Sequence, residues 1–206
     1  MNLVPIVPEI IVLVAACVAL IGDAFSRDRE HTFAYWLSQL GLLAALTANT
    51  LTITRTRELL FGGMFVREPM SVVLKSFVLT TVIVVLVYTR DYLRQRRLLS
   101  GEYFVLALVA VLGMMVLISA GNLLLVYLGL ELLSLSLYSM VAMHRDSLAA
   151  SEAAMKYFVL GAIASGMLLY GMSILYGITG SLDLTQVSAG VAAAVLRRVY
   201  KQHLFP

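Results

Sequence analysis

Charged residues are scarce in this chain. Only 13% of its 206 residues are Asp, Glu, Lys or Arg, against roughly 25% in ordinary globular domains. Hydrophobic residues make up 61% of the chain, and the mean hydropathy is +0.92. Several runs of about 18 or more residues carry one charge or none, which is typical of membrane-spanning helices. The net charge of +3 does not indicate nucleic-acid binding, because the arginines lie in short connections between these runs.

Cysteine and the usual catalytic motifs are equally sparse. Cys17 is the single cysteine, so the chain forms no internal disulfide, and without a Cys/His cluster it suggests no metal site. None of the three histidines lies deep in an apolar run, which excludes paired haem ligands. No phosphate loop, hydrolytic triad, internal repeat or low-complexity tract is present. Residues 1–8 lack the basic segment of a signal peptide, so we expect the first apolar run to be retained.

Six apolar runs predict an all-α polytopic membrane protein, because in lipid a single segment satisfies its own backbone only as a helix. The predicted spans cover about residues 8–25, 33–53, 70–89, 102–120, 122–143 and 151–179. The second run is diluted by Ser38, Gln39, Thr47 and Asn49. We therefore expect residues 1–184 to form one transmembrane helical bundle.

The character of the chain changes after Gly180. Residues 185–206 hold only one short apolar stretch, 187–196, followed by basic and polar residues. Ten residues are too few to cross the hydrocarbon core. The tail is therefore expected to be an interfacial helix or the stub of an interrupted seventh span.

Two connections carry their own signals. Gly62 and Gly63, flanked by apolar residues in 57–68, are compatible with a small β-hairpin, and an irregular surface loop fits equally well. The fourth and fifth runs are separated only by Gly121 and Asn122. Since Asn is a favoured N-cap residue, we expect Asn122 to cap the fifth helix and the two helices to form a tight antiparallel pair.

Basic residues predict the orientation in the membrane. One set of connections holds seven arginines: Arg27, Arg29, Arg90, Arg94, Arg96, Arg97 and Arg145. The opposite set holds Arg55, Arg57 and Arg67, and the tail adds Arg197, Arg198 and Lys201 to that side. The excess between spans places the first set in the cytoplasm and the N-terminus in the periplasm.

Glu131 is an ionisable residue near the middle of the fifth span. A carboxylate at that depth costs about 2.5–3.5 kcal/mol on insertion scales, so its presence favours a functional role. Tyr127, Glu131, Ser134 and Tyr138 are spaced by four, three and four residues and therefore share one helix face. The structural alternative is a protonated glutamic acid held by neighbouring hydroxyls, contributing only to helix packing. We favour proton or ion handling.

Two lysines also lie within the predicted spans. At 1.5 Å per residue, Glu131 lies about 16 Å below the cytoplasmic boundary and Lys156 about 6–9 Å below it. This separation is too large for an assured salt bridge but is within reach of one or two waters, so Lys156 is a candidate relay partner. Snorkelling to the headgroups is the alternative. Lys75 lies only four or five residues into the third span from the opposite side, and there we expect snorkelling.

At these residues the sequence becomes similar to a known family. Residues 121–184, which include the segments Gly-Leu-Glu-Leu-Leu-Ser and Met-Lys-Tyr-Phe, closely resemble the subunit N family of bacterial NADH–quinone oxidoreductase, respiratory complex I. The segment Leu-Phe-Gly-Gly-Met-Phe at 60–65 resembles the loop after that family's second span. The resemblance extends over residues 1 to about 184.

The resemblance implies an antiporter-like, proton-translocating subunit of the membrane arm in the bacterial inner membrane, driven by quinone reduction elsewhere in the complex. Glu131 matches the family's fifth-helix glutamate, and Lys156 matches the lysine of its Met-Lys-Tyr-Phe segment. The expected partners are other membrane-arm subunits and the lipid bilayer, with quinone contact left open. Flavin and iron–sulfur clusters are expected on other subunits, with no cofactor in this chain.

The chain departs from the family pattern at its end. Members of the family have about fourteen spans with inverted repeats, and a lysine in an interrupted seventh helix partners the glutamate. Residues 186–206 do not continue this pattern, which indicates a fragment or a truncated product. Two further hypotheses are a stand-alone Mrp-type cation/proton antiporter and a structural membrane-arm subunit whose buried charges only aid assembly.

Overall fold

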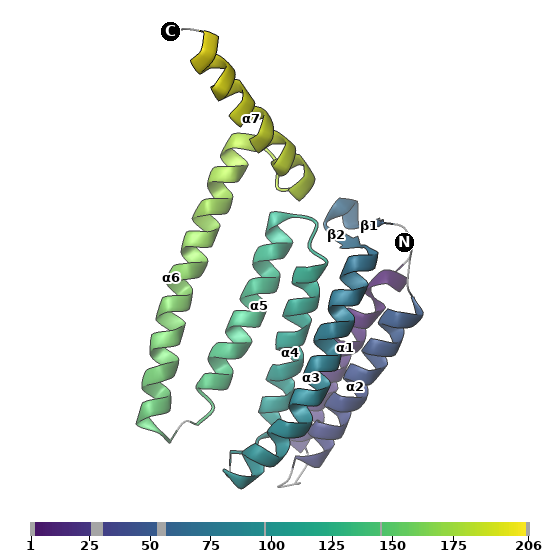
Figure 1. Cartoon of the computed structure of the whole chain (residues 1–206). Coiled ribbons are helices and arrows are strands. Elements are labelled where there is room, and N and C mark those ends of the chain that lie inside the picture. Colours follow the sequence, from purple (N-terminus) through teal and green to yellow (C-terminus); the bar gives the residue numbers. More distant parts are fainter. Residues whose placement is uncertain (1–2, 26–30, 53–56, 97, 145, 205–206) are drawn as a thin grey trace.

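The computed structural model describes residues 3–25, 31–52, 57–96, 98–144 and 146–204, with side chains described up to residue 194. Within these ranges most of the chain is helical (Figure 1). The α-helices are α1 (Val7–Phe25), α2 (Thr32–Leu51), α3 (Pro69–Gln95), α4 (Gly101–Ile118), α5 (Leu123–Val141), α6 (Leu148–Thr179) and α7 (Leu184–Leu204). A 3-10 turn, η1 (Val4–Ile6), precedes α1.

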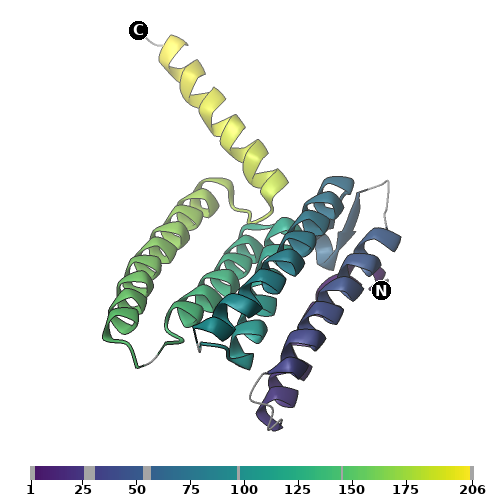
Figure 2. The ribbon, with the colours of Figure 1, turned by 60° about the horizontal axis from the view of Figure 1, so that its bottom comes forward.

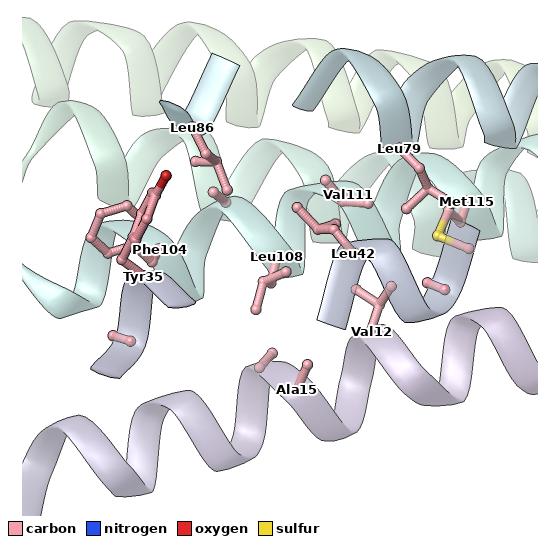
Figure 3. Close-up of a cluster of buried hydrophobic side chains, with 14 residues drawn as sticks. Val12, Ala15, Tyr35, Leu42, Leu79, Leu86, Phe104, Leu108, Val111 and Met115 are labelled. Carbon is pink, nitrogen blue, oxygen red and sulfur yellow. The ribbon is translucent and has the colours of Figure 1, made fainter. Parts of the chain in front are cut away.

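The first four helices enclose the hydrophobic core. Val12 of α1, Leu42 of α2, Leu79 of α3 and Leu108 of α4 are each fully buried in one cluster (Figure 3). α5 packs against α4, whereas α6 stands at the edge of the bundle and α7 projects away from it in both views (Figure 2). Every residue of α6 is at least partly exposed, so the buried core of this chain lies among α1–α4.

Glycines allow α4 and α5 to approach closely. A Cβ on Gly113 would lie 2.7 Å from the backbone nitrogen of Leu133 and 2.9 Å from the carbonyl oxygen of Gly129. A Cβ on Gly129 would in turn lie 3.0 Å from the carbonyl oxygen of Gly113. Small residues at such positions permit backbone-to-backbone packing between membrane helices. The predicted tight antiparallel pair is confirmed.

The prediction of a helical membrane protein is confirmed. Of the described helices, α1 with η1, α3, α4, α5 and α6 are long and apolar enough to cross a membrane. α2 forms as expected over 20 residues but is not among these five. The polar residues within α2 make it less apolar than the other five. Two of them bond to α3: Gln39 Nε2 donates to the carbonyl of Ile83 at 3.2 Å, and Asn49 Nδ2 donates to the carbonyl of Val72 at 2.9 Å. Gln39 and Asn49 of α2 are therefore turned toward α3.

A two-stranded antiparallel hairpin joins α2 to α3, which decides between the two interpretations of residues 57–68. β1 (Glu58–Leu60) pairs with β2 (Phe65–Arg67) across the 3-10 turn η2 (Phe61–Gly63). Gly62 and Gly63 have φ of 67° and 93°, a left-handed backbone that glycine adopts without strain. The two glycines were thus the correct turn signal.

The hairpin is hydrogen-bonded to the connection between α4 and α5. The amide of Val66 donates to the carbonyl of Ser119 at 2.8 Å, and the amide of Gly121 donates to the carbonyl of Met64 at 2.7 Å. On its other side Gly121 accepts from the amide of Leu184 at 3.1 Å. Asn122 Oδ1 accepts from the amide of Leu125 at 2.8 Å, so the predicted cap of α5 is confirmed.

The structure tests the predictions for the tail and for the basic connections only in part. Residues 184–204 are helical, as both alternatives for the tail require, and the apolar portion, 184–194, is shorter than a span. α3 runs on to Gln95, beyond the predicted end at 89. Of the residues used to predict the orientation, Arg27, Arg29, Arg55, Arg97 and Arg145 lie outside the described ranges, and the side chains of Arg197, Arg198 and Lys201 are not described. The orientation stays a prediction.

Candidate proton-transfer site

The polar face of α5 is present as the spacing predicts. Tyr127, Glu131, Ser134 and Tyr138 are all partly buried, although α5 is otherwise rich in leucine. Tyr127 lies one helical turn from Glu131, and the two side chains interact electrostatically. A phenol is therefore a neighbour of the membrane carboxyl group.

This face is turned toward α6. Near the start of α5, Tyr127 lines a groove of about 260 Å³ together with Ser173 and Tyr176 of α6. At the other end, the ring of Tyr138 lies 4.9 Å from that of Tyr157 and 5.7 Å from that of Phe158, measured between centroids. The polar side chains of α5 thus occupy the boundary between the two helices.

Gly161 makes room for the side chain of Tyr138. A Cβ at position 161 would overlap the hydroxyl of Tyr138, so the absence of a side chain lets this phenol reach the backbone of α6. Gly166, Gly171 and Gly177 have nothing within 4 Å of such a Cβ. Only one of these α6 glycines therefore serves the contact with α5.

Lys156 has a partner that the sequence analysis did not identify. Its Nζ lies 2.5 Å from Oε1 of Glu152, one turn earlier on the same helix, and the two side chains are 70% and 67% exposed. In the described part of the chain the ion-pair partner of Lys156 is Glu152, not Glu131. The i,i+4 spacing of Glu152 and Lys156 was visible in the sequence and was the signal for this pair.

A second ionisable cluster lies at the hairpin end of the bundle. Lys75 Nζ is 2.5 Å from Glu9 Oε1, and the side chains are only 1% and 6% exposed. The prediction that Lys75 snorkels is wrong, because a carboxylate from the first turn of α1 meets it inside the protein. The Lys75 ammonium also lies 4.9 Å from the centroid of the Phe65 ring. Glu9 and Lys75 are 66 residues apart, so no local spacing pattern indicated the pair.

Arg67 completes this cluster. It was counted as a loop charge, yet it is 1% exposed. Its guanidinium donates to the carbonyl of Pro5 at 2.8 Å, to the carbonyl of Asn49 at 3.3 Å and to Oγ1 of Thr52 at 2.6 Å. Burial lowers the pKa of Arg67 below its usual range, and the carboxylates of Glu9 and Glu58 oppose this shift. We define Glu9, Asn49, Arg67 and Lys75 as the hairpin-end cluster.

Known proteins similar to this chain point to one respiratory family. Over 188 residues it is 55% identical to NADH-quinone oxidoreductase subunit N of Thiobacillus denitrificans. The chain matches the N-terminal part of subunit N. Subunit N of Thioalkalivibrio sulfidiphilus is 51% identical over 187 residues, and in both cases the alignment covers 91% of this chain and 39% of the relative. This chain thus spans about two fifths of the length of these subunit N relatives.

A sequence profile and a solved structure agree with this result. Residues 120–203 match the family described as the transmembrane region of NADH:quinone oxidoreductase/Mrp antiporters, so α5, α6 and nearly all of α7 fall within it. The expectation that the family pattern stops before residue 186 is therefore wrong, because the match continues to residue 203. A chain of respiratory complex I from Thermus thermophilus, solved with bound aureothin, superimposes with a TM-score of 0.70 and 31% identity. That match covers 86% of this chain and 38% of the Thermus chain. The similarity to subunit N therefore extends from sequence to three-dimensional structure.

The described residues offer no metal site. Among them, no group of three or more His, Cys, Asp or Glu side chains is arranged to hold an ion. Two of the ionisable groups described above lie at separate places, Glu131 on the face of α5 and the Glu9–Lys75 pair in the hairpin-end cluster.

Proposed function

We propose that this chain is part of a proton-translocating membrane-arm subunit of NADH–quinone oxidoreductase, in which Glu131 and Lys156 relay protons. The observation that carries the proposal is the position of Glu131. It is an ionisable group inside an apolar helix, one turn from Tyr127, within the segment that matches the NADH:quinone oxidoreductase/Mrp antiporter family. An ionisable residue in a membrane span marks a functional site by default.

In this proposal Glu131 holds the proton in the middle of the span. Tyr127 donates to the carboxylate when Glu131 is ionised, and Ser134 and Tyr138 continue the polar face toward Lys156. Since the nearest ion-pair partner of Lys156 is Glu152, the transfer between Glu131 and Lys156 requires intervening water or a movement of α6 relative to α5. The partly exposed face of α6 is consistent with such a movement.

The proposed setting follows from the relatives. As a subunit of the enzyme complex, the protein would contact other membrane-arm subunits and lipid in the bacterial inner membrane, with its N-terminus in the periplasm. Flavin, iron–sulfur clusters and the NADH site would belong to other subunits. Quinone reduction there would supply the free energy for the proton step.

A second candidate is a stand-alone cation/proton antiporter, because the matching family description names Mrp antiporters as well. The full-length subunit can be tagged and purified from its native membrane to separate the two. Copurification with a large assembly that reduces quinone with NADH supports the first function. An isolated protein that exchanges cations under an imposed pH gradient supports the second.

A structural subunit is the remaining alternative. Glu131→Gln in the full-length subunit removes the titratable carboxyl group but preserves the size of the side chain. Lost proton pumping in a normally assembled complex excludes a purely structural role. Normal pumping by that complex would overturn the proposed relay.

A further inference from the structure

The hairpin-end cluster contains buried polar atoms whose hydrogen-bonding capacity is unused. Among the described residues, Glu9 Oε2, Asn49 Oδ1 and Arg67 Nε have no hydrogen-bond partner. Their residues are 5%, 1% and 1% exposed. A buried ion pair compensates for its lost hydration only if the remaining lone pairs and protons are also satisfied. Three such atoms in one cluster therefore need a common explanation.

The other atoms of these side chains are already committed. Glu9 Oε1 accepts from Lys75, and Asn49 Nδ2 donates both to the carbonyl of Val72 and to Ser76 Oγ, each at 2.9 Å. The terminal nitrogens of Arg67 are held by backbone carbonyls and by Thr52. Rotating any of these side chains to satisfy its free atom would break bonds that already exist.

The three atoms belong to neighbouring groups. Arg67 donates to the backbone carbonyls of both Pro5 and Asn49, and Pro5 precedes Glu9 by one helical turn. The Arg67 charge interacts electrostatically with Glu9 and with Lys75. The arginine thus links the turn before α1 to the end of α2, and α1 and α2 are the helices that carry Glu9 and Asn49.

We propose that the hairpin-end cluster binds an internal water molecule that accepts a hydrogen bond from Arg67 Nε and donates to Glu9 Oε2 and Asn49 Oδ1. One N–H donor and two acceptor oxygens match the bonding capacity of water, and buried waters typically make about three hydrogen bonds. A sodium ion would suit the two oxygens but would be repelled by the adjacent guanidinium. The site is separate from Glu131 and does not depend on the proposed proton relay.

The bound water explains how two cations and a carboxylate are accommodated together inside the protein. It would bridge residues from α1, α2 and β2, while Arg67 itself joins β2 to the turn before α1 and to α2. The water, the ion pair and the arginine thus hold the hairpin against the first three helices.

The test is a cryo-electron microscopy map of the assembled complex containing the full-length subunit, at a resolution that shows single waters. We expect a density peak within hydrogen-bonding distance of all three atoms, in sodium chloride and in choline chloride alike. A peak seen only in sodium chloride would identify a cation and overturn the proposal. A direct contact between Arg67 Nε and Glu9 Oε2, or no peak at all, would overturn it as well.

A variant map adds a matched comparison. Asn49→Leu removes one acceptor and fills part of the space, so the peak is expected to disappear while the Glu9–Lys75 pair remains. Persistence of the peak in this variant would contradict the assigned geometry. The wild-type map alone decides the proposal if the variant does not assemble.

Discussion

Lys75 Nζ lies 2.5 Å from Glu9 Oε1, and both side chains are almost completely shielded from solvent. The pair connects the first turn of α1 to the second turn of α3, on elements separated by 66 residues. Because it meets the hairpin through Phe65 and Arg67, it is an anchor for the end of the bundle at which the chain begins.

Removing one partner of this pair is expected to lower the stability of the protein much more than removing both partners. Lys75→Met leaves the Glu9 carboxylate buried without its cation, and breaking a buried pair costs about 3–5 kcal/mol. The double variant Glu9→Leu/Lys75→Met removes both charges and should recover most of that loss. Thermal unfolding of the purified complex measures both, and a double variant no more stable than Lys75→Met would contradict this account.

Because α4 and α5 pack closely, a single methyl group added between them is expected to destabilise the protein. Gly113→Ala places a Cβ against the backbone of α5, where no side-chain rotation can relieve the overlap, and overpacking costs about 1–3 kcal/mol. Gly166→Ala on α6 is the matched control, since no described residue beyond the neighbouring backbone of its own helix lies within 4 Å of the added atom. An equal decrease in unfolding temperature for both variants would contradict this account.

Asp183 is expected to make the stability of the first turn of α7 depend on pH. Its pKa lies below the ordinary value of 3.8, first because the Thr185 hydroxyl donates to the carboxylate and next because the Gln186 amide does. The ionised group therefore stabilises the helix start above pH 3.8, and this contribution is lost as the pH falls through the lower folded pKa.

Hydrogen exchange at the amides of Thr185 and Gln186 measures this contribution. Asp183→Asn keeps a side-chain acceptor but does not titrate, so protection in the variant should no longer change across the acid range. A wild-type protection that is constant below pH 3.8 would contradict the assignment.

The exposed pair on α6 is expected to contribute little to stability. Exposed i,i+4 ion pairs are worth about 0.3–0.5 kcal/mol, so Glu152→Gln should leave the unfolding temperature almost unchanged. Lys156→Met should likewise unfold normally but should reduce proton translocation, because we propose that Lys156 takes part in the relay. Equal effects of the two variants on pumping would indicate that the pair, rather than Lys156 alone, participates.

Local patterns in the sequence predicted most of the fold. The apolar runs and the Asn122 cap each depend on neighbouring residues, and both are present in the structure. At Gly62 and Gly63 the sequence left a hairpin and an irregular loop open, and the structure has the hairpin. The face of α5 followed from helical periodicity alone. The Lys75 prediction failed because its partner comes from a distant helix, and burial of a lysine is decided by such long-range contacts. Arg67 was misjudged for the same reason.

The most direct test of the central claim compares Glu131→Gln with Glu131→Asp in the full-length subunit, in complexes assembled to the wild-type level. Proton uptake is measured per NADH oxidised in sealed vesicles. Because Gln cannot take up or release a proton, Glu131→Gln should lower the number of protons taken up per NADH oxidised. Glu131→Asp, which keeps a carboxyl group, should retain part of it. Wild-type uptake in the Glu131→Gln complex would contradict a proton relay through Glu131.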